Sequence, residues 1–190
     1  MRVEFLLEEK SMKYALEILL PKILPPSYKV GENCFLRPHN GKSDLRNSIA
    51  KKVKVFSHFH EEVKLVILHD QDSNDCKALK QELKKLCEDN GDCPVLIRIP
   101  CRELEAWYLG DMKAIEQAYP KFNASKFQNK EKFRNPDHCR ASSELKKIIP
   151  TFQKGTAAKE IPKYMSIERN TSESFNQFVN GLKAFLISNR

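Results

Sequence analysis

Short apolar segments alternate along the chain with segments of helical periodicity, and this alternation limits the possible folds more than any other feature. Apolar or alternating runs predict strands over residues 3–7, 34–37, 64–69 and 95–99. Apolar residues at helical spacing predict a helix that begins with Ser11 as its N-cap and stops at Pro25. The same spacing predicts helices over 44–56, 75–87, 103–109, 112–119, 142–149 and 174–187. Strands joined by helical crossovers form parallel sheets. The sequence therefore predicts an α/β fold with about four mostly parallel strands flanked by helices.

The length of 190 residues suits one hydrophobic core. We expect a single domain, with a core over residues 1–119 and a helical C-terminal extension over 120–190. The N-terminal residues do not have the pattern of a signal peptide, and the apolar runs are shorter than the roughly 20 residues needed to cross a bilayer. We therefore expect a cytoplasmic protein with no membrane span.

The six cysteines lie far apart, without the close spacing typical of zinc sites. In a reducing cytoplasm we expect them to be free thiols that fill small apolar spaces. The formal net charge is +8. This charge favours the approach of a polyanion such as nucleic acid, although many basic proteins bind none.

Carboxylates follow three of the four predicted strands where each strand ends. Glu8 follows the first strand, Asp70 and Asp72 follow the third, and Glu103 and Glu105 lie just after the fourth. Because parallel strands end at the same edge of a sheet, we expect these side chains to converge there. Crowded carboxylates repel one another unless a cation lies among them, and such oxygen ligands suit Mg²⁺ or Mn²⁺. All five acids are candidate ligands, for one metal ion or for two.

Structural roles compete with these functional interpretations. Acids that follow strands often cap the next helix, and we interpret Asp75 as such an N-cap. Strand alternation points His69 away from Asp70, which predicts a packed histidine. Trp107 and Tyr108 are interpreted as packing residues of their helix, in preference to residues that stack on a base.

Basic side chains follow the second predicted strand. We expect Arg37, His39 and Lys42 to lie at the same edge as the acids and to bind a substrate phosphate. A lone histidine is more often structural, so both roles stay open for His39.

Several segments resemble known families. Glu8 in FLLEEKS, with Asp70 and Asp72 in VILHDQD, resembles the acidic positions of the TOPRIM fold of topoisomerases, primases and the nucleases associated with OLD-type ATPases. More closely, LRPHNGKSDL, RELEAWYLGD, NPDH and SESFNQFVNGL resemble the bacterial family called domain of unknown function 4276. This resemblance implies a TOPRIM-like, Mg²⁺-dependent nuclease, often encoded beside an ATPase and suspected of a part in defence against phage. It also implies that Glu105 is the fourth acidic residue. TOPRIM-like proteins commonly have Gly after the first acid, where this chain has Glu9.

Three functions are compatible with these observations. The first is a metal-dependent nuclease that cleaves a phosphodiester bond with Glu8, Asp70, Asp72 and Glu105 as its catalytic acids. The second is a phosphatase of the haloacid dehalogenase type, because DQDS matches the nucleophile motif of that family. Strand order argues against it, since the family's nucleophile follows the first strand and the motif here follows the third. The third is a non-catalytic nucleic-acid-binding or regulatory module of a partner ATPase.

Overall fold

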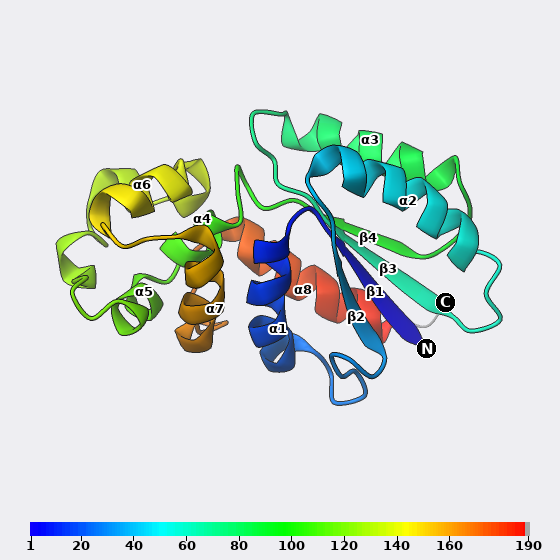
Figure 1. Cartoon of the computed structure of the whole chain (residues 1–190), viewed down its shortest axis with the longest axis horizontal. Coiled ribbons are helices and arrows are strands. Elements are labelled where there is room, and N and C mark those ends of the chain that lie inside the picture. Colours follow the sequence, from blue (N-terminus) through cyan, green and yellow to red (C-terminus); the bar gives the residue numbers. More distant parts are fainter. Residues whose placement is uncertain (189–190) are drawn as a thin grey trace.

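The computed structural model describes residues 1–188, and a four-stranded sheet lies at its centre (Figure 1). The strands are β1 (Arg2–Leu7), β2 (Cys34–Pro38), β3 (Val63–Leu68) and β4 (Val95–Arg98). Their order is β2-β1-β3-β4, and each neighbouring pair is parallel. The predicted parallel α/β fold is therefore confirmed.

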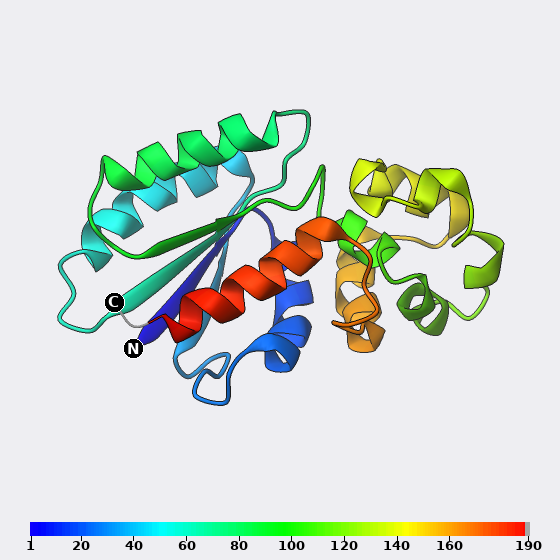
Figure 2. The same cartoon turned by 180° about the vertical axis from the view of Figure 1, so that it is seen from behind.

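The central strands β1 and β3 are covered on both faces. The run Leu65–Leu68 of β3 is fully buried, as a continuous apolar segment in a parallel sheet should be. One face of the sheet packs on α2 (Lys42–Phe56) and α3 (Cys76–Glu88). The other face packs on α1 (Lys10–Ile23) and α8 (Glu173–Ile187), as the two opposite views show (Figures 1 and 2).

The remaining helices form a lobe on the side toward which the strands run (Figure 1). This helical lobe contains α4 (Glu105–Leu109), α5 (Met112–Ala118), α6 (Ala141–Ile148) and α7 (Lys154–Tyr164). Three short 3₁₀ helices, at Ala124–Lys126, Glu131–Phe133 and Pro136–His138, connect α5 to α6. The lobe therefore lies beside the carboxyl edge of the sheet, where the acids are expected.

Helix boundaries confirm one predicted cap and correct another. The Asp75 carboxylate accepts the backbone N–H of Ala78 at 2.8 Å, so Asp75 is the N-cap of α3. The prediction that Ser11 caps α1 is wrong, because the helix begins one residue earlier and the Ser11 hydroxyl bonds to the carboxylate of Glu9. Helix α7 has no counterpart among the predicted helices, since Gly155 near its start and a proline inside it weaken the helical pattern.

Trp107 joins the helical lobe to the sheet. Its indole ring is fully buried, with its centroid 5.3 Å from the ring of Phe175 and 5.0 Å from that of Phe178. The indole N–H donates to the hydroxyl of Ser174 at 3.0 Å. The predicted packing role is confirmed. Because these partners belong to α8, residues after 119 share one hydrophobic core with the strands.

All six cysteines are free thiols. Burial raises the pKa of the Cys87 thiol to about 12, and the protonated form is a poor nucleophile. Within residues 1–188, no helix has both the length and the apolar character that crossing a bilayer requires.

Candidate metal centre

The pairing of β1 with β3 brings two acids together at the carboxyl edge. Leu7 pairs with Leu68, so Glu8 lies beside the residues that follow β3. The backbone N–H of Glu8 donates to the carbonyl of Leu68 at 3.2 Å. The backbone N–H of Asp70 in turn donates to Oε2 of Glu8 at 3.0 Å. Main-chain contacts therefore hold the Glu8 carboxylate over the end of β3.

Asp70 and Glu105 are the deeply buried acids of this edge, at 6% and 1% exposure. Within the described residues, no hydrogen-bond donor reaches Oδ1 of Asp70 or either carboxylate oxygen of Glu105. Buried carboxylate oxygens without donors are costly, and a nearby cation is the usual compensation.

Burial is the largest cause of the raised pKa of these acids. It raises the pKa of Asp70 well above its usual value, and the carboxylates of Glu105 and Glu8 raise it further. Burial also raises the pKa of Glu105 to about 7, although Lys154 lowers it in part. The pKa of Glu8 is raised by burial and lowered in part by His69. The cluster therefore favours binding a proton or a metal ion.

Lys154, at the start of α7, supplies one cation to the cluster. Its Nζ lies 3.4 Å from Oε2 of Glu105 and 3.4 Å from Oε2 of Glu103. The contact with Glu105 has the distance of an ion pair but not the alignment of a hydrogen bond. Burial lowers the pKa of Lys154, but the nearby carboxylates, first Glu105 and Glu103, together raise it by more, so its net pKa is raised. The ammonium group therefore stays charged.

Glu103, expected as a metal ligand, has protein partners for both carboxylate oxygens. Oε1 accepts the backbone N–H of Ser142 at 2.7 Å, in the first turn of α6. Oε2 lies within reach of Lys154. A carboxylate that accepts an N–H in the first turn of a helix stabilises that helix. Glu103 thus links the strand end to α6.

Asp72 lies at the mouth of the site, with its side chain 46% exposed. Its φ of 53° and the φ of 61° at Arg102 are both in the left-handed region, where non-glycine residues are strained. The two loops are joined, because the N–H of Asp72 donates to the Arg102 carbonyl at 2.7 Å. The Arg102 N–H donates to Oε1 of Gln71 at 2.9 Å. These contacts hold Asp72 in its strained position.

Of the three basic residues expected to bind phosphate, Lys42 forms an ion pair with one of the acids. Its Nζ is 3.8 Å from Oδ2 of Asp72, and its side chain is exposed at the start of α2. His39 lies at the same edge, with Nδ1 2.9 Å from the carbonyl of Leu7. The structure does not bring Arg37 to the acids, because its Nε donates to the buried Glu4 carboxylate at 2.9 Å, in the middle of β1.

His69 is a site residue that sequence reasoning missed. Its predicted burial is confirmed, but the ring does not point away from the acids. Nδ1 lies 3.1 Å from Oε2 of Glu8 and 2.7 Å from the carbonyl of Asp70. Strand alternation fails here because β3 ends at Leu68. The register of β1 against β3 places His69 beside Glu8. The sequence alone does not give this register.

Tyr108 is the second such residue. It is fully buried, and its hydroxyl has no hydrogen-bond partner among the described residues. Burial raises the pKa of this hydroxyl, and the charges of Glu105, Glu9 and Asp70 raise it further. Tyr108 is therefore a neutral hydroxyl close to the acids and able to donate a hydrogen bond.

The donor set has the chemistry that a hard divalent cation requires. Mg²⁺ is commonly held by one or two carboxylates together with water and substrate phosphate. The oxygens of Asp70 and Glu105 that make no hydrogen bond, with Glu8 beside Asp70, match this requirement. Within residues 1–188 no three His, Cys, Asp or Glu side chains are already arranged as a complete ligand set. Water, or rotation of Glu8 or Asp72, would complete the coordination.

Comparison with known proteins identifies the family. The family model called domain of unknown function 4276 (DUF4276) matches residues 7–183, so the chain belongs to that family. Neither curated proteins nor solved structures give a significant match.

Proposed function

We propose that this member of the DUF4276 family is a Mg²⁺- or Mn²⁺-dependent nuclease, or a related enzyme that cleaves phosphodiester bonds. One observation carries the proposal: buried carboxylate oxygens of Asp70 and Glu105 make no hydrogen bonds among the described residues, at the carboxyl edge of the sheet. Ligands of open parallel sheets bind at this edge. A cation would remove the cost of burying these carboxylates.

The surrounding residues have complementary roles in the proposal. Asp70, Glu105 and Glu8 would hold the metal ion, and Asp72 would join them from the mouth of the site. A bound Mg²⁺ supplies Lewis-acid stabilisation of phosphate charge and lowers the pKa of water. The Lys42 side chain is exposed, so its ammonium would neutralise an incoming phosphate oxygen.

Two further residues would influence the ligands. The His69 ring lies beside the Glu8 carboxylate and would orient it, as outer contacts of metal sites commonly do. Lys154 balances part of the negative charge on Glu105 in the metal-free protein, so its ammonium would compete with the metal ion.

The charge of the chain supports nucleic acid as the substrate. A net charge of +8 gives affinity for a phosphate backbone through counterion release. The TOPRIM-like spacing of Glu8, Asp70 and Asp72 supports the same class of substrate. A cytoplasmic partner ATPase, of the AAA or OLD type, and a role in antiviral defence complete this proposal.

A non-catalytic nucleic-acid-binding or regulatory module is the competing function. The contacts of Lys154 favour it, because this ammonium already neutralises part of the charge on Glu105 and Glu103. An acidic cluster held in this way could stabilise the helical lobe without a metal ion.

Incubation with plasmid, single-stranded DNA and RNA at several Mg²⁺ and Mn²⁺ concentrations separates the two functions. Cleavage by the wild type should be lost in Asp70→Asn and in Glu105→Gln, with the fold retained by circular dichroism. Asp75→Asn is the matched control, because it removes one charge from the same loop and asparagine still caps α3. Binding of nucleic acid with no metal-dependent cleavage, alone or with the ATPase, would contradict the nuclease and favour the module.

A further inference from the structure

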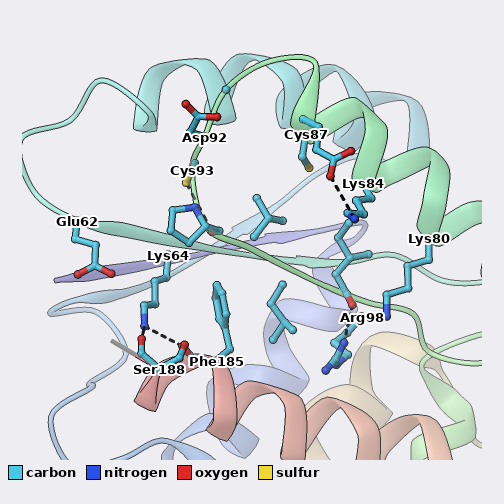
Figure 3. Close-up of a pocket in the computed structure, with 16 residues that line it drawn as sticks. Glu62, Lys64, Lys80, Lys84, Cys87, Asp92, Cys93, Arg98, Phe185 and Ser188 are labelled. Carbon is cyan, nitrogen blue, oxygen red and sulfur yellow. Dashed lines mark hydrogen bonds and ion pairs between the residues drawn. The ribbon is translucent and has the colours of Figure 1, made fainter. Parts of the chain in front are cut away.

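A groove runs along the outer edge of β4, between α3 and α8 (Figure 3). Its volume is about 770 Å³. The backbone of residues 93–98 forms its floor, Cys87 and neighbouring residues of α3 form one wall, and Phe185 of α8 forms the other. We call this feature the β4 groove. It contains the edge strand β4, of which Val95, Leu96 and Arg98 are partly exposed and the Ile97 side chain is buried.

The hydrogen-bond register shows which backbone groups of β4 face the groove. The N–H of Leu65 donates to the carbonyl of Pro94, and the N–H of His69 donates to that of Arg98. In a parallel ladder the bonding residues alternate, so the N–H and C=O groups of Val95 and Ile97 point away from β3. The groove therefore presents two residues with the backbone groups that another strand would need.

The charged side chains of the groove are divided between its two ends. Lys80 and Arg98 lie at the carboxyl end of β4, and Glu62 and Asp92 lie at the amino end (Figure 3). Throughout residues 1–188, none of these four side chains forms an ion pair.

The other charged groups of the groove are already satisfied. Lys84 pairs with Glu88 at 3.3 Å. The buried ammonium of Lys64 donates to the carbonyls of Phe185 and Ser188 at 2.9 and 2.7 Å. Only the charges at the two ends remain available for a partner.

Contacts with α8 fix the side chain of Arg98. Its Nε donates to the carbonyl of Gln177 at 3.0 Å, and its Nη1 donates to the carbonyl of Ile97 at 3.0 Å. Gly181 leaves the space that the guanidinium occupies, because a Cβ at this position would lie 1.7 Å from Nη2. The groove thus keeps a positive group fixed at one end.

We propose that the β4 groove is the interface of a homodimer in which β4 strands of two copies pair antiparallel about a two-fold axis at Leu96. Val95 would exchange backbone hydrogen bonds with Ile97 of the partner subunit, and the reverse pair follows by symmetry. A carbonyl oxygen has two lone pairs, so that of Ile97 can accept the new bond and keep Arg98. The two sheets would become one sheet of eight strands.

The charges select a second copy of the chain over an unrelated strand. Antiparallel pairing places the positive end of each groove against the negative end of the other. Lys80 and Arg98 of one copy then approach Asp92 and Glu62 of the partner subunit. A surface that is positive at one end and negative at the other is self-complementary under a two-fold rotation.

Analytical ultracentrifugation of the full chain tests the interface. We expect a dimer for the wild type. Two charge-reversed variants, Lys80→Glu with Arg98→Glu and Glu62→Lys with Asp92→Lys, should each be monomeric, because like charges then meet at both ends. An equimolar mixture of the two variants should form a heterodimer, since the all-acidic groove then meets the all-basic one.

A control variant outside the groove separates the effect of the interface from a general effect of charge. Lys85→Glu reverses a charge on α3 outside the groove and should stay dimeric. Circular dichroism checks that each variant is folded. If the variant with Arg98→Glu does not fold, the single substitution Lys80→Glu, with Asp92 and Glu62 kept acidic, replaces it and should weaken the dimer. A wild type that is monomeric up to about 100 μM, well above the micromolar dissociation constants of ordinary dimers, would overturn the proposal. A dimer that survives both reversals, or a mixture that stays monomeric, would also overturn it.

Discussion

Nδ1 of His69 lies 3.1 Å from Oε2 of Glu8, the same carboxylate oxygen that accepts the backbone N–H of Asp70. The main chain holds this oxygen by a hydrogen bond, and the buried His69 ring lies against it while Nδ1 also contacts the carbonyl of Asp70 at 2.7 Å. Outer contacts of this kind set the orientation of metal ligands.

His69→Gln should weaken Mg²⁺ binding by about ten-fold, because the Glu8 carboxylate loses a fixed partner. Isothermal titration calorimetry without nucleic acid measures this effect directly. His58→Gln is the control, since the His58 ring is exposed and lies 2.8 Å from the carbonyl of Lys54, outside the acidic cluster. Equal Mg²⁺ affinities of His69→Gln and the wild type would show that the His69 ring only fills space.

The Glu105 carboxyl should make the metal-free protein less stable as the pH rises. Its pKa is about 7 in the folded protein, against an ordinary value of 4.5, so the folded state binds more protons between these values. This stabilisation is present below about pH 4.5 and is lost as the pH rises through about 7. Urea unfolding with a chelator at about pH 5 and about pH 8 should show a larger loss for the wild type than for Glu105→Gln, by up to about 3 kcal/mol. Equal losses of stability in the wild type and in Glu105→Gln would contradict a raised pKa at Glu105.

Lys154→Met should change stability and metal binding in opposite directions. Breaking a buried ion pair costs about 3–5 kcal/mol. The 39% exposure of Lys154 reduces the expected loss of stability without metal to about 1–3 kcal/mol. Mg²⁺ should bind more tightly, because the carboxylates lose a competing cation.

Thermal unfolding of Lys154→Met with and without Mg²⁺ measures both effects. Lys147→Met is the control, since it removes an exposed lysine that pairs with Glu144 on the surface of α6. Weaker Mg²⁺ binding by Lys154→Met would instead show that the ammonium helps to assemble the site.

Trp107→Ala should lower the free energy of unfolding by about 3–5 kcal/mol, because the indole fills the space between α4 and α8. Unfolding in urea, followed by far-ultraviolet circular dichroism, should remain a single transition for both proteins, since the helical lobe and the sheet share this core. A separate early transition of the lobe in the wild type would contradict the shared core.

The sheet was predictable because its strands are short apolar runs with clear ends. The run at Leu65–Leu68 is typical of a strand that is covered on both faces, and the acids come directly after it in the chain. A parallel sheet is enough to place Glu8 and Asp70 at the same edge, and the pairing of β1 with β3 then brings them into contact. These parts of the fold and of the site depend on local sequence.

The remaining site contacts depend on side-chain choices that local sequence does not determine. Lys154 reaches Glu105 from a helix that the sequence pattern did not reveal. Arg37 could point to the strand end or back along the sheet, and the buried Glu4 carboxylate decides the outcome. Glu103 has the same chemistry as Glu105. Its carboxylate accepts an N–H in the first turn of α6 only because α6 lies beside it in the fold.

Helix α8 covers a face of the sheet although it follows all four strands by many residues in the chain. On the ribosome, the strands leave the exit tunnel well before residues 173–187 are synthesised. During that interval the apolar face that α8 will cover is open to other chains, with the edge of β4 beside it. A nascent polypeptide in this state is a natural client for chaperones, and slowing translation before Glu173 would lengthen its exposure to aggregation.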